Sequence, residues 1–358
     1  MQASDSKDMT TDSQSRSAWK DAPRRFLTVG IGVPSIVLLL RHYVTSWLFF
    51  QGAHLICLIE WKNLVPSPDQ DSKKNDAAES KRSTSQKAAF PTKSTLQQLL
   101  SMFDDQWLSL TKLEKCEFYA FACFSLATTI LPTSLIPLEL MFAGISLRLI
   151  PHFRTLQTTQ SPCSREIHTI QHYQFGLAYI SIGFHFLLQI CREGGPINIG
   201  CLLFVVWMSD TGALILGRLM RKKAVSCKEN TGKDMQQNPF LSFLKSVSPG
   251  KTLPGLFGAI ITGPISAILY PIDLQPSATN PGLLSFGLSH DSDTIFQKAI
   301  LGILLSVSGI VGDLAESSVK RMSRKKDSGG LLPGHGGVVD RFDSVFTAGI
   351  VYYYWVLA

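Results

Sequence analysis

Residues 300–321 read ILGILLSVSGIVGDLAESSVKR, an apolar run that passes directly into a charged segment. Asp313, Glu316, Ser317 and Lys320 are spaced i, i+3, i+4 and i+7, so a helix places them on one face. The preceding apolar run puts the two acids about two helical turns inside a membrane boundary. Charge at that depth is costly and usually marks a functional site. The stretch therefore predicts a membrane helix that ends in such a site.

The composition of the whole chain agrees with this interpretation. Of its 358 residues, 45% are hydrophobic and only 17% are charged, whereas a soluble domain carries about 25% charged residues. A membrane-spanning helix needs about 20 apolar residues. Stretches that meet or approach this length are 26–40, 43–61, 117–131, 133–150, 174–191, 196–217, 252–271, 296–314 and 344–358. We predict an all-α, polytopic integral membrane protein with about nine transmembrane helices; buried helices of a soluble protein are the alternative.

The distribution of polar residues divides the chain into five parts. We expect a disordered polar arm over 1–25, a first transmembrane helix pair over 26–61, a flexible polar linker over 62–98, further membrane helices over 99–195, and a membrane domain with the charged motifs over 196–358.

The net charge of +7 comes from basic loops that separate the apolar stretches. Such loops set membrane topology, so we predict no nucleic-acid partner. The segment 272–295 contains no Lys or Arg, which places the basic loops, and the charged motifs with them, on the cytosolic or equivalent face. The seven cysteines form no CxxC pair, so neither zinc nor a structural disulfide is predicted.

A second acid lies inside an apolar run. Asp210 interrupts the stretch 197–216 and is predicted at the same membrane depth as Asp313. Carboxylates that share a site are stabilised as anions by a divalent cation, and Mg²⁺ prefers oxygen ligands. The metal candidates are thus Asp313, Asp210 and Glu316. Ion pairs that only hold helices together, or a proton relay at Asp210, are the alternatives.

Two loops have the composition of phosphate sites. The first loop leads into the stretch 252–271 and contains Ser248, Gly250, Lys251 and Thr252. Free N–H groups at the start of a helix, together with the lysine cation, suit a phosphate. A Walker A motif is excluded because position 245 is Lys rather than Gly. A plain helix start with a lysine reaching the membrane surface is the alternative.

The loop 320–343 is the densest group of charges. It holds five basic residues, five glycines, and then His335, Asp340, Arg341 and Asp343. Arg341 suits bidentate phosphate binding, and His335 suits contact with a phosphate or proton donation to a leaving group. A topogenic cluster followed by helix-capping acids is the alternative.

This arrangement closely resembles the phosphatidate cytidylyltransferase family. That family's C-terminal pattern is Ser, any, apolar, Lys-Arg, four residues, Lys-Asp, small and apolar positions, His-Gly-Gly, apolar, any, Asp-Arg, apolar, Asp. The places are filled here by Ser317, Val319, Lys320, Arg321, Lys326, Asp327, Gly329, Leu332, Pro333, His335, Gly336, Gly337, Val338, Asp340, Arg341, Phe342 and Asp343. The stretches 210–218 and 248–252 also resemble the family. One departure is Leu253-Pro254-Gly255, where the family commonly has Trp-Glu-Gly.

The resemblance implies transfer of a cytidylyl group from CTP to phosphatidic acid, giving CDP-diacylglycerol and pyrophosphate, and makes 196–358 the catalytic membrane domain. It implies Mg²⁺ as cofactor, with a second cation open, and CTP, phosphatidic acid and membrane lipid as partners, with a homodimer also expected. The catalytic residues it implies are Asp313, Lys320, Arg321, Asp327, His335, Asp340 and Arg341. The substrate-binding residues it implies are Ser248, Gly250, Lys251, Thr252, Ser317, Lys326, Gly336, Gly337 and Asp343.

Three other functions remain open at this point. A transporter would use the intramembrane acids as a coupling site, and a structural membrane protein would keep the motif without activity. A closer alternative transfers the nucleotidyl group to another phosphorylated lipid alcohol. Both a eukaryotic organelle membrane and a bacterial inner membrane fit the sequence.

Overall fold

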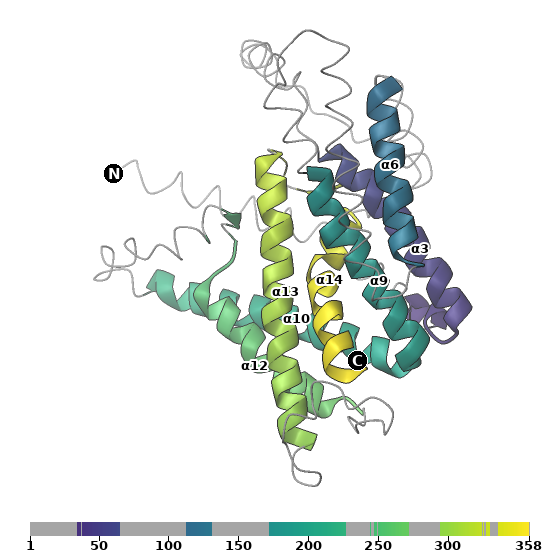
Figure 1. Cartoon of the computed structure of the whole chain (residues 1–358). Coiled ribbons are helices and arrows are strands. Elements are labelled where there is room, and N and C mark those ends of the chain that lie inside the picture. Colours follow the sequence, from purple (N-terminus) through teal and green to yellow (C-terminus); the bar gives the residue numbers. More distant parts are fainter. Residues whose placement is uncertain are drawn as a thin grey trace, which may run out of the picture.

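The structure is a computed structural model that describes residues 34–36, 38–64, 112–130, 172–226, 244, 247–248, 250–271, 294–323, 325, 327–329 and 336–357. These residues contain helices and no strand, which confirms the predicted all-α class. The helices are α3 (Tyr43–Asn63), α6 (Lys112–Thr128), α9 (Ile182–Gln189), α10 (Gly195–Ser226), α12 (Leu253–Leu269), α13 (Thr294–Met322) and α14 (Val339–Val356), with π-helical turns η2 (Leu177–Ser181) and η3 (Ile190–Gly194) on either side of α9 (Figure 1).

Two helical stretches among the described residues are long and apolar enough to cross a membrane, His172–Met220 and Ile295–Met322. Helix α12 is apolar but shorter, with 17 residues. The predicted arm 1–25 and span 133–150 lie outside the described residues, as does most of the linker 62–98. The nine-helix topology and the five-part division of the chain therefore stay predictions.

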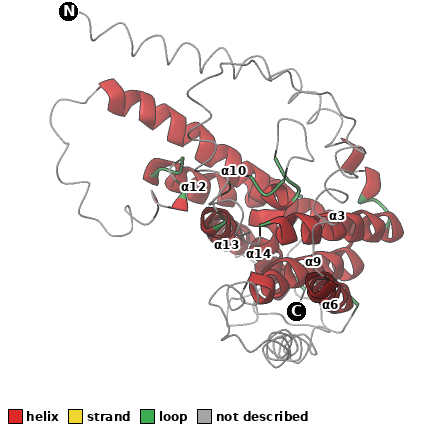
Figure 2. Cartoon of the chain, turned by 90° about the horizontal axis from the view of Figure 1, so that it is seen from above, coloured by secondary structure: helices red, strands yellow, loops and turns green. Residues whose placement is uncertain are grey.

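The first of these stretches contains a change of backbone conformation. Gly195, between η3 and α10, has φ 70° and ψ −171°, a conformation that glycine adopts without steric cost. It lies between the two predicted spans 174–191 and 196–217. Figure 2 views α13 and α6 nearly end-on while α10 and α3 run across the view, so α10 crosses α13 steeply.

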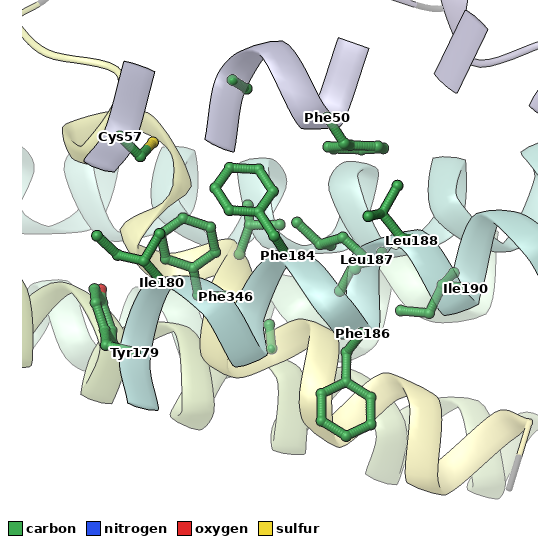
Figure 3. Packing of buried hydrophobic residues seen from close by; sticks show 14 of the residues in the cluster. Phe50, Cys57, Tyr179, Ile180, Phe184, Phe186, Leu187, Leu188, Ile190 and Phe346 are labelled. Carbon is green, nitrogen blue, oxygen red and sulfur yellow. The ribbon is translucent and has the colours of Figure 1, made fainter. Parts of the chain in front are cut away.

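Aromatic side chains fill the space between α3, α9 and α14. Phe184 of α9 is fully buried, and its ring centroid lies 5.0 Å from that of Phe346 and 6.5 Å from that of Phe50 (Figure 3). Both pairs are edge-to-face, the arrangement that the ring quadrupoles favour. We call Phe50, Phe184, Phe342 and Phe346 the aromatic cluster.

The interface of α10, α12 and α13 is packed through glycines instead of aromatic rings. A Cβ atom on Gly258 of α12 would come within 2.5 Å of the Gly212 carbonyl oxygen of α10. A Cβ on Gly302 of α13 would come equally close to the Pro264 Cα of α12, at 2.5 Å. The helices thus pack backbone against backbone, as small residues permit in membranes. We call Gly212, Gly258, Gly263 and Gly302 the glycine seam.

Candidate functional site

Three carboxylates gather between α13 and α14. Asp313 and Glu316 of α13 and Asp343 of α14 each contribute one oxygen to a group in which all lie within 4.8 Å of one another. Glu316 is fully buried, whereas the other two are half-buried. The spacing on α13 predicted the first two. The third was predicted as a substrate-binding residue, and its position makes it a candidate ligand as well.

Lys320 holds the inner end of this acidic group. Its Nζ lies 2.5 Å from Glu316 Oε2 and 2.7 Å from Asp340 Oδ1. Asp340 also accepts hydrogen bonds from the backbone N–H groups of Gly337 (2.7 Å) and Ser328 (3.1 Å). Lys320 is therefore engaged by two carboxylates, and Asp340 connects it to the loop before α14. Both residues were predicted to be catalytic, and that role stays a prediction.

Lys251 reaches the acidic group from the start of α12. Its Nζ lies 2.7 Å from Asp313 Oδ2, and Ser317 Oγ donates to Asp313 Oδ1 at 3.2 Å. Thr252 is the N-cap of α12, where its hydroxyl accepts from the Gly255 N–H at 3.2 Å, as N-cap residues commonly do. The predicted phosphate loop thus adjoins the acids, with Gly250 exposed and Ser248 partly buried.

Asp210 approaches the group from α10. It interacts electrostatically with Asp313, Lys251 and Arg341, and Asp343 also feels its charge. The tight group of three oxygens nevertheless consists of Asp313, Glu316 and Asp343 rather than Asp210. Asp210 thus lies beside the group, and its predicted role as a metal ligand stays a prediction.

The remaining predicted residues lie around this centre. Arg321 is exposed, and its Nε donates to the Val247 carbonyl oxygen at 3.1 Å; Arg341 and Asp327 are exposed as well. Gly336 has φ 78°, so the turn there needs a glycine. His335 and Lys326 lie outside the described residues. Next to this loop, burial lowers the pKa of Lys325.

Two residues near the site were not predicted. The Tyr179 hydroxyl lies 2.9 Å from the carbonyl oxygens of both Gly312 and Asp343, and so bridges α13 and α14. Glu60 of α3 accepts hydrogen bonds from the backbone N–H groups at the start of α14. The available signal for Glu60 was its position as the single acid in the predicted span 43–61. Tyr179 carried no signal, because an aromatic residue in an apolar run is ordinary.

Comparison with known proteins identifies the family of the chain. A sequence profile of the cytidylyltransferase family matches residues 88–228 and 239–358. This chain belongs to the cytidylyltransferase family. The resemblance found in the motifs is thereby confirmed. The matched ranges contain the whole of α10, α12, α13 and α14, whereas α3 precedes them.

Curated relatives carry a more specific name. A phosphatidate cytidylyltransferase of Staphylococcus epidermidis is 36% identical over 168 residues, which is 47% of this chain and 52% of the relative. Proteins of the same name from Staphylococcus saprophyticus and Staphylococcus aureus are 35% identical over 168 residues and 33% identical over 172, with the same shares covered. The chain spans about half the length of the curated relatives it matches. With the two apolar helices, these similarities indicate a membrane protein.

Proposed function

We propose that the chain transfers the cytidylyl group of CTP to phosphatidic acid, giving CDP-diacylglycerol and pyrophosphate. The observation that carries this proposal is the group of three carboxylate oxygens within 4.8 Å, with the Lys251 ammonium against Asp313. Acids and bases on one centre suit a reaction in which several phosphates converge. The group lies at the charged end of an apolar helix, where a lipid substrate and a water-soluble one can meet. The names of the relatives supply the two substrates.

The acidic group fits a divalent cation. All three donors are carboxylate oxygens, the ligand type that Mg²⁺ prefers. Glu316 is fully buried, and the Lys320 ammonium that lies 2.5 Å from its Oε2 is shared with Asp340. Carboxylates that crowd around one shared ammonium are costly to keep as anions, so a bound cation would relieve this arrangement. We assign Asp313, Glu316 and Asp343 as the ligands, with Asp210 behind them and a second cation open.

Bound Mg²⁺ would offset the negative charge of the CTP phosphates. Basic side chains of the chain would bind the phosphates directly. Lys251 would leave Asp313 and bind a phosphate oxygen, while the exposed Arg341 and Arg321 would bind further phosphate oxygens. An oxygen of the lipid phosphate then forms a bond to the α-phosphorus of CTP. The bond from that phosphorus to the bridging oxygen breaks, and the electron pair leaves with pyrophosphate. No protein nucleophile is required.

The same proposal covers the setting of the reaction. The enzyme would be a multi-pass membrane protein whose site faces the cytosol or the equivalent compartment, since the positive-inside rule predicts the basic loops on that face. A eukaryotic organelle membrane and a bacterial inner membrane both satisfy this arrangement. We also expect a homodimer, which cross-linking in vesicles would detect.

The test is an assay of the purified full chain in phosphatidic acid vesicles with CTP and Mg²⁺. We expect release of pyrophosphate together with formation of CDP-diacylglycerol. Asp313→Asn should lower kcat/KM by about 100-fold or more, because the change removes one carboxylate charge from the proposed metal site. Glu193→Gln is the matched control, since Glu193 is an exposed acid whose hydrogen-bond partner is the Tyr353 hydroxyl.

Several outcomes would contradict the proposal. Activity in Asp313→Asn equal to that of the wild type would remove the acidic group from the reaction. Absence of any CTP-dependent pyrophosphate release would favour a transporter. A phosphorylated isoprenol that outcompetes phosphatidic acid would reassign the acceptor.

A further inference from the structure

Glu60 lies outside the acidic group, and each of its carboxylate oxygens accepts at least one hydrogen bond. It is 1% exposed, in the last turn of α3. Its Oε1 accepts from the Val338 N–H at 3.0 Å, and its Oε2 accepts from the Val339 N–H at 2.9 Å and from Ser328 Oγ at 3.2 Å. A buried carboxylate with a donor on each oxygen is strongly oriented.

These bonds supply what α14 lacks. The first N–H groups of a helix have no partner within the helix and usually bond to a side chain of the N-cap residue. The N-cap of α14 is Val338, whose side chain makes no such bond. Glu60, 278 positions before Val338 in the chain, instead accepts from the N–H groups of Val338 and Val339. A carboxylate also complements the positive end of the helix dipole.

The same end of α3 binds the other side of the loop. The Ser323 hydroxyl donates to the Leu64 carbonyl oxygen, and the Lys325 ammonium donates to the Asn63 carbonyl oxygen. A Cβ atom on Gly337 would lie 2.6 Å from Glu60 Oε2, and one on Gly329 would lie 2.8 Å from Glu60 Cδ. The loop therefore needs glycine at these two positions in order to close on Glu60.

A short series of contacts connects Glu60 to the acidic group. The loop that Glu60 holds contains Ser328 and Gly337, whose N–H groups donate to Asp340. Asp340 pairs with Lys320, and Lys320 pairs with Glu316. Release of the loop would therefore loosen the Asp340–Lys320 side of the site without removing any of its acidic or basic groups.

We propose that Glu60 is a positioning residue for cytidylyl transfer: it caps α14 from α3 and holds Ser328 and the backbone of Gly337 and Val338 in the geometry that supports CTP binding. This inference rests on the proposed function. It gives α3, which precedes the residues matched by the family profile, a direct part in the site.

The test is Glu60→Gln in the full chain. The amide keeps the size of the side chain but replaces one acceptor oxygen with an N–H₂ group that faces a donor. We expect the KM for CTP to rise about tenfold, the size of effect seen when a residue that orients the binding groups is changed. The fall in kcat should be smaller. Hydrogen exchange of the peptide containing Val338 and Val339 should become faster in protein without nucleotide. A purely structural role would lower the active fraction and leave the KM unchanged.

Two further variants provide the controls. Gln51→Leu removes a polar contact of the same helix, the 2.8 Å bond to Thr129 Oγ1, and should leave both KM and loop exchange at wild-type values. Ser328→Ala should add little to Glu60→Gln, because residues that act as one unit are not additive.

The outcomes separate the two proposals. Wild-type protein that makes no CDP-diacylglycerol refutes the proposed function, while the exchange comparison still decides whether Glu60 holds the loop. Unchanged KM and unchanged exchange in Glu60→Gln overturn the positioning role. Equal changes in Gln51→Leu also overturn it, because they would reflect general loosening of α3.

Discussion

The glycine seam and the aromatic cluster are two opposite ways of packing helices in one molecule. In the seam, a Cβ on Gly258 would meet the Gly212 carbonyl oxygen at 2.5 Å, so the backbones themselves are in contact. In the cluster, the rings of Phe184 and Phe346 keep the helix axes apart and fill the space between them. The seam has almost no side-chain volume between its helices, whereas the cluster fills the space between its helices with large side chains.

This difference matches what each region does for the site. The seam joins α10, α12 and α13: Asp210 lies on α10, Asp313 lies on α13, and Lys251 directly precedes α12. The close approach of these backbones lets Lys251 reach Asp313. The cluster joins α3, α9 and α14, whereas Glu60 is held against the start of α14 by its own hydrogen bonds. We infer that the seam sets distances within the charged centre and that the cluster mainly sets stability.

The largest effect is expected in the cluster. Phe184→Ala removes a fully buried ring and should lower the free energy of unfolding by about 3–5 kcal/mol. Thermal unfolding in detergent measures the loss, and the surviving folded enzyme should keep a KM for CTP near that of the wild type. Phe257→Ala is the control, because that ring is 62% exposed. Equal melting temperatures for Phe184→Ala and the wild type would refute the separation of roles.

The seam should respond in the opposite sense, to added volume. Gly258→Ala places a methyl group against the Gly212 carbonyl oxygen and should cost about 1–3 kcal/mol of stability. The larger expected change is in kcat/KM, since α10 and α12 must move apart and carry Asp210 and Lys251 with them. Gly52→Ala tests the specificity of the effect, because a Cβ there meets nothing within 4 Å. A Gly258→Ala enzyme with normal activity and lower stability would assign the seam to stability alone.

The sequence was informative where the signal is local. Apolar length predicted α13, and the spacing of Asp313, Glu316 and Lys320 placed them on one face, because a helix fixes that relation within a few residues. The engagement of Lys320 by two carboxylates was not predicted, since Asp340 is 20 positions away. Glu60 lay further out of reach. Contacts between residues far apart in the chain depend on helix packing, which a single sequence does not reveal.

The smallest effect is expected at Tyr179, which lies between the aromatic cluster and the charged centre. Its ring packs edge-on against Phe346 of the cluster, with centroids 5.4 Å apart, while its hydroxyl bonds the Gly312 and Asp343 carbonyl oxygens beside the acids. Tyr179→Phe keeps the ring and removes only the hydroxyl. Helical carbonyls already accept from their own helix, so the loss should be about 1 kcal/mol of stability, measured as a small fall in melting temperature.

Activity is the sharper readout for Tyr179→Phe. If the cluster acts on the site only through stability, the variant keeps its kcat and KM, as does the control Tyr354→Phe, whose ring is 45% exposed. A fall in kcat without a fall in melting temperature would mean that the hydroxyl holds Asp343 in place relative to Asp313. Contacts on the aromatic side of the molecule would then also set distances in the charged centre, and the proposed separation of roles between the seam and the cluster would not hold for α14.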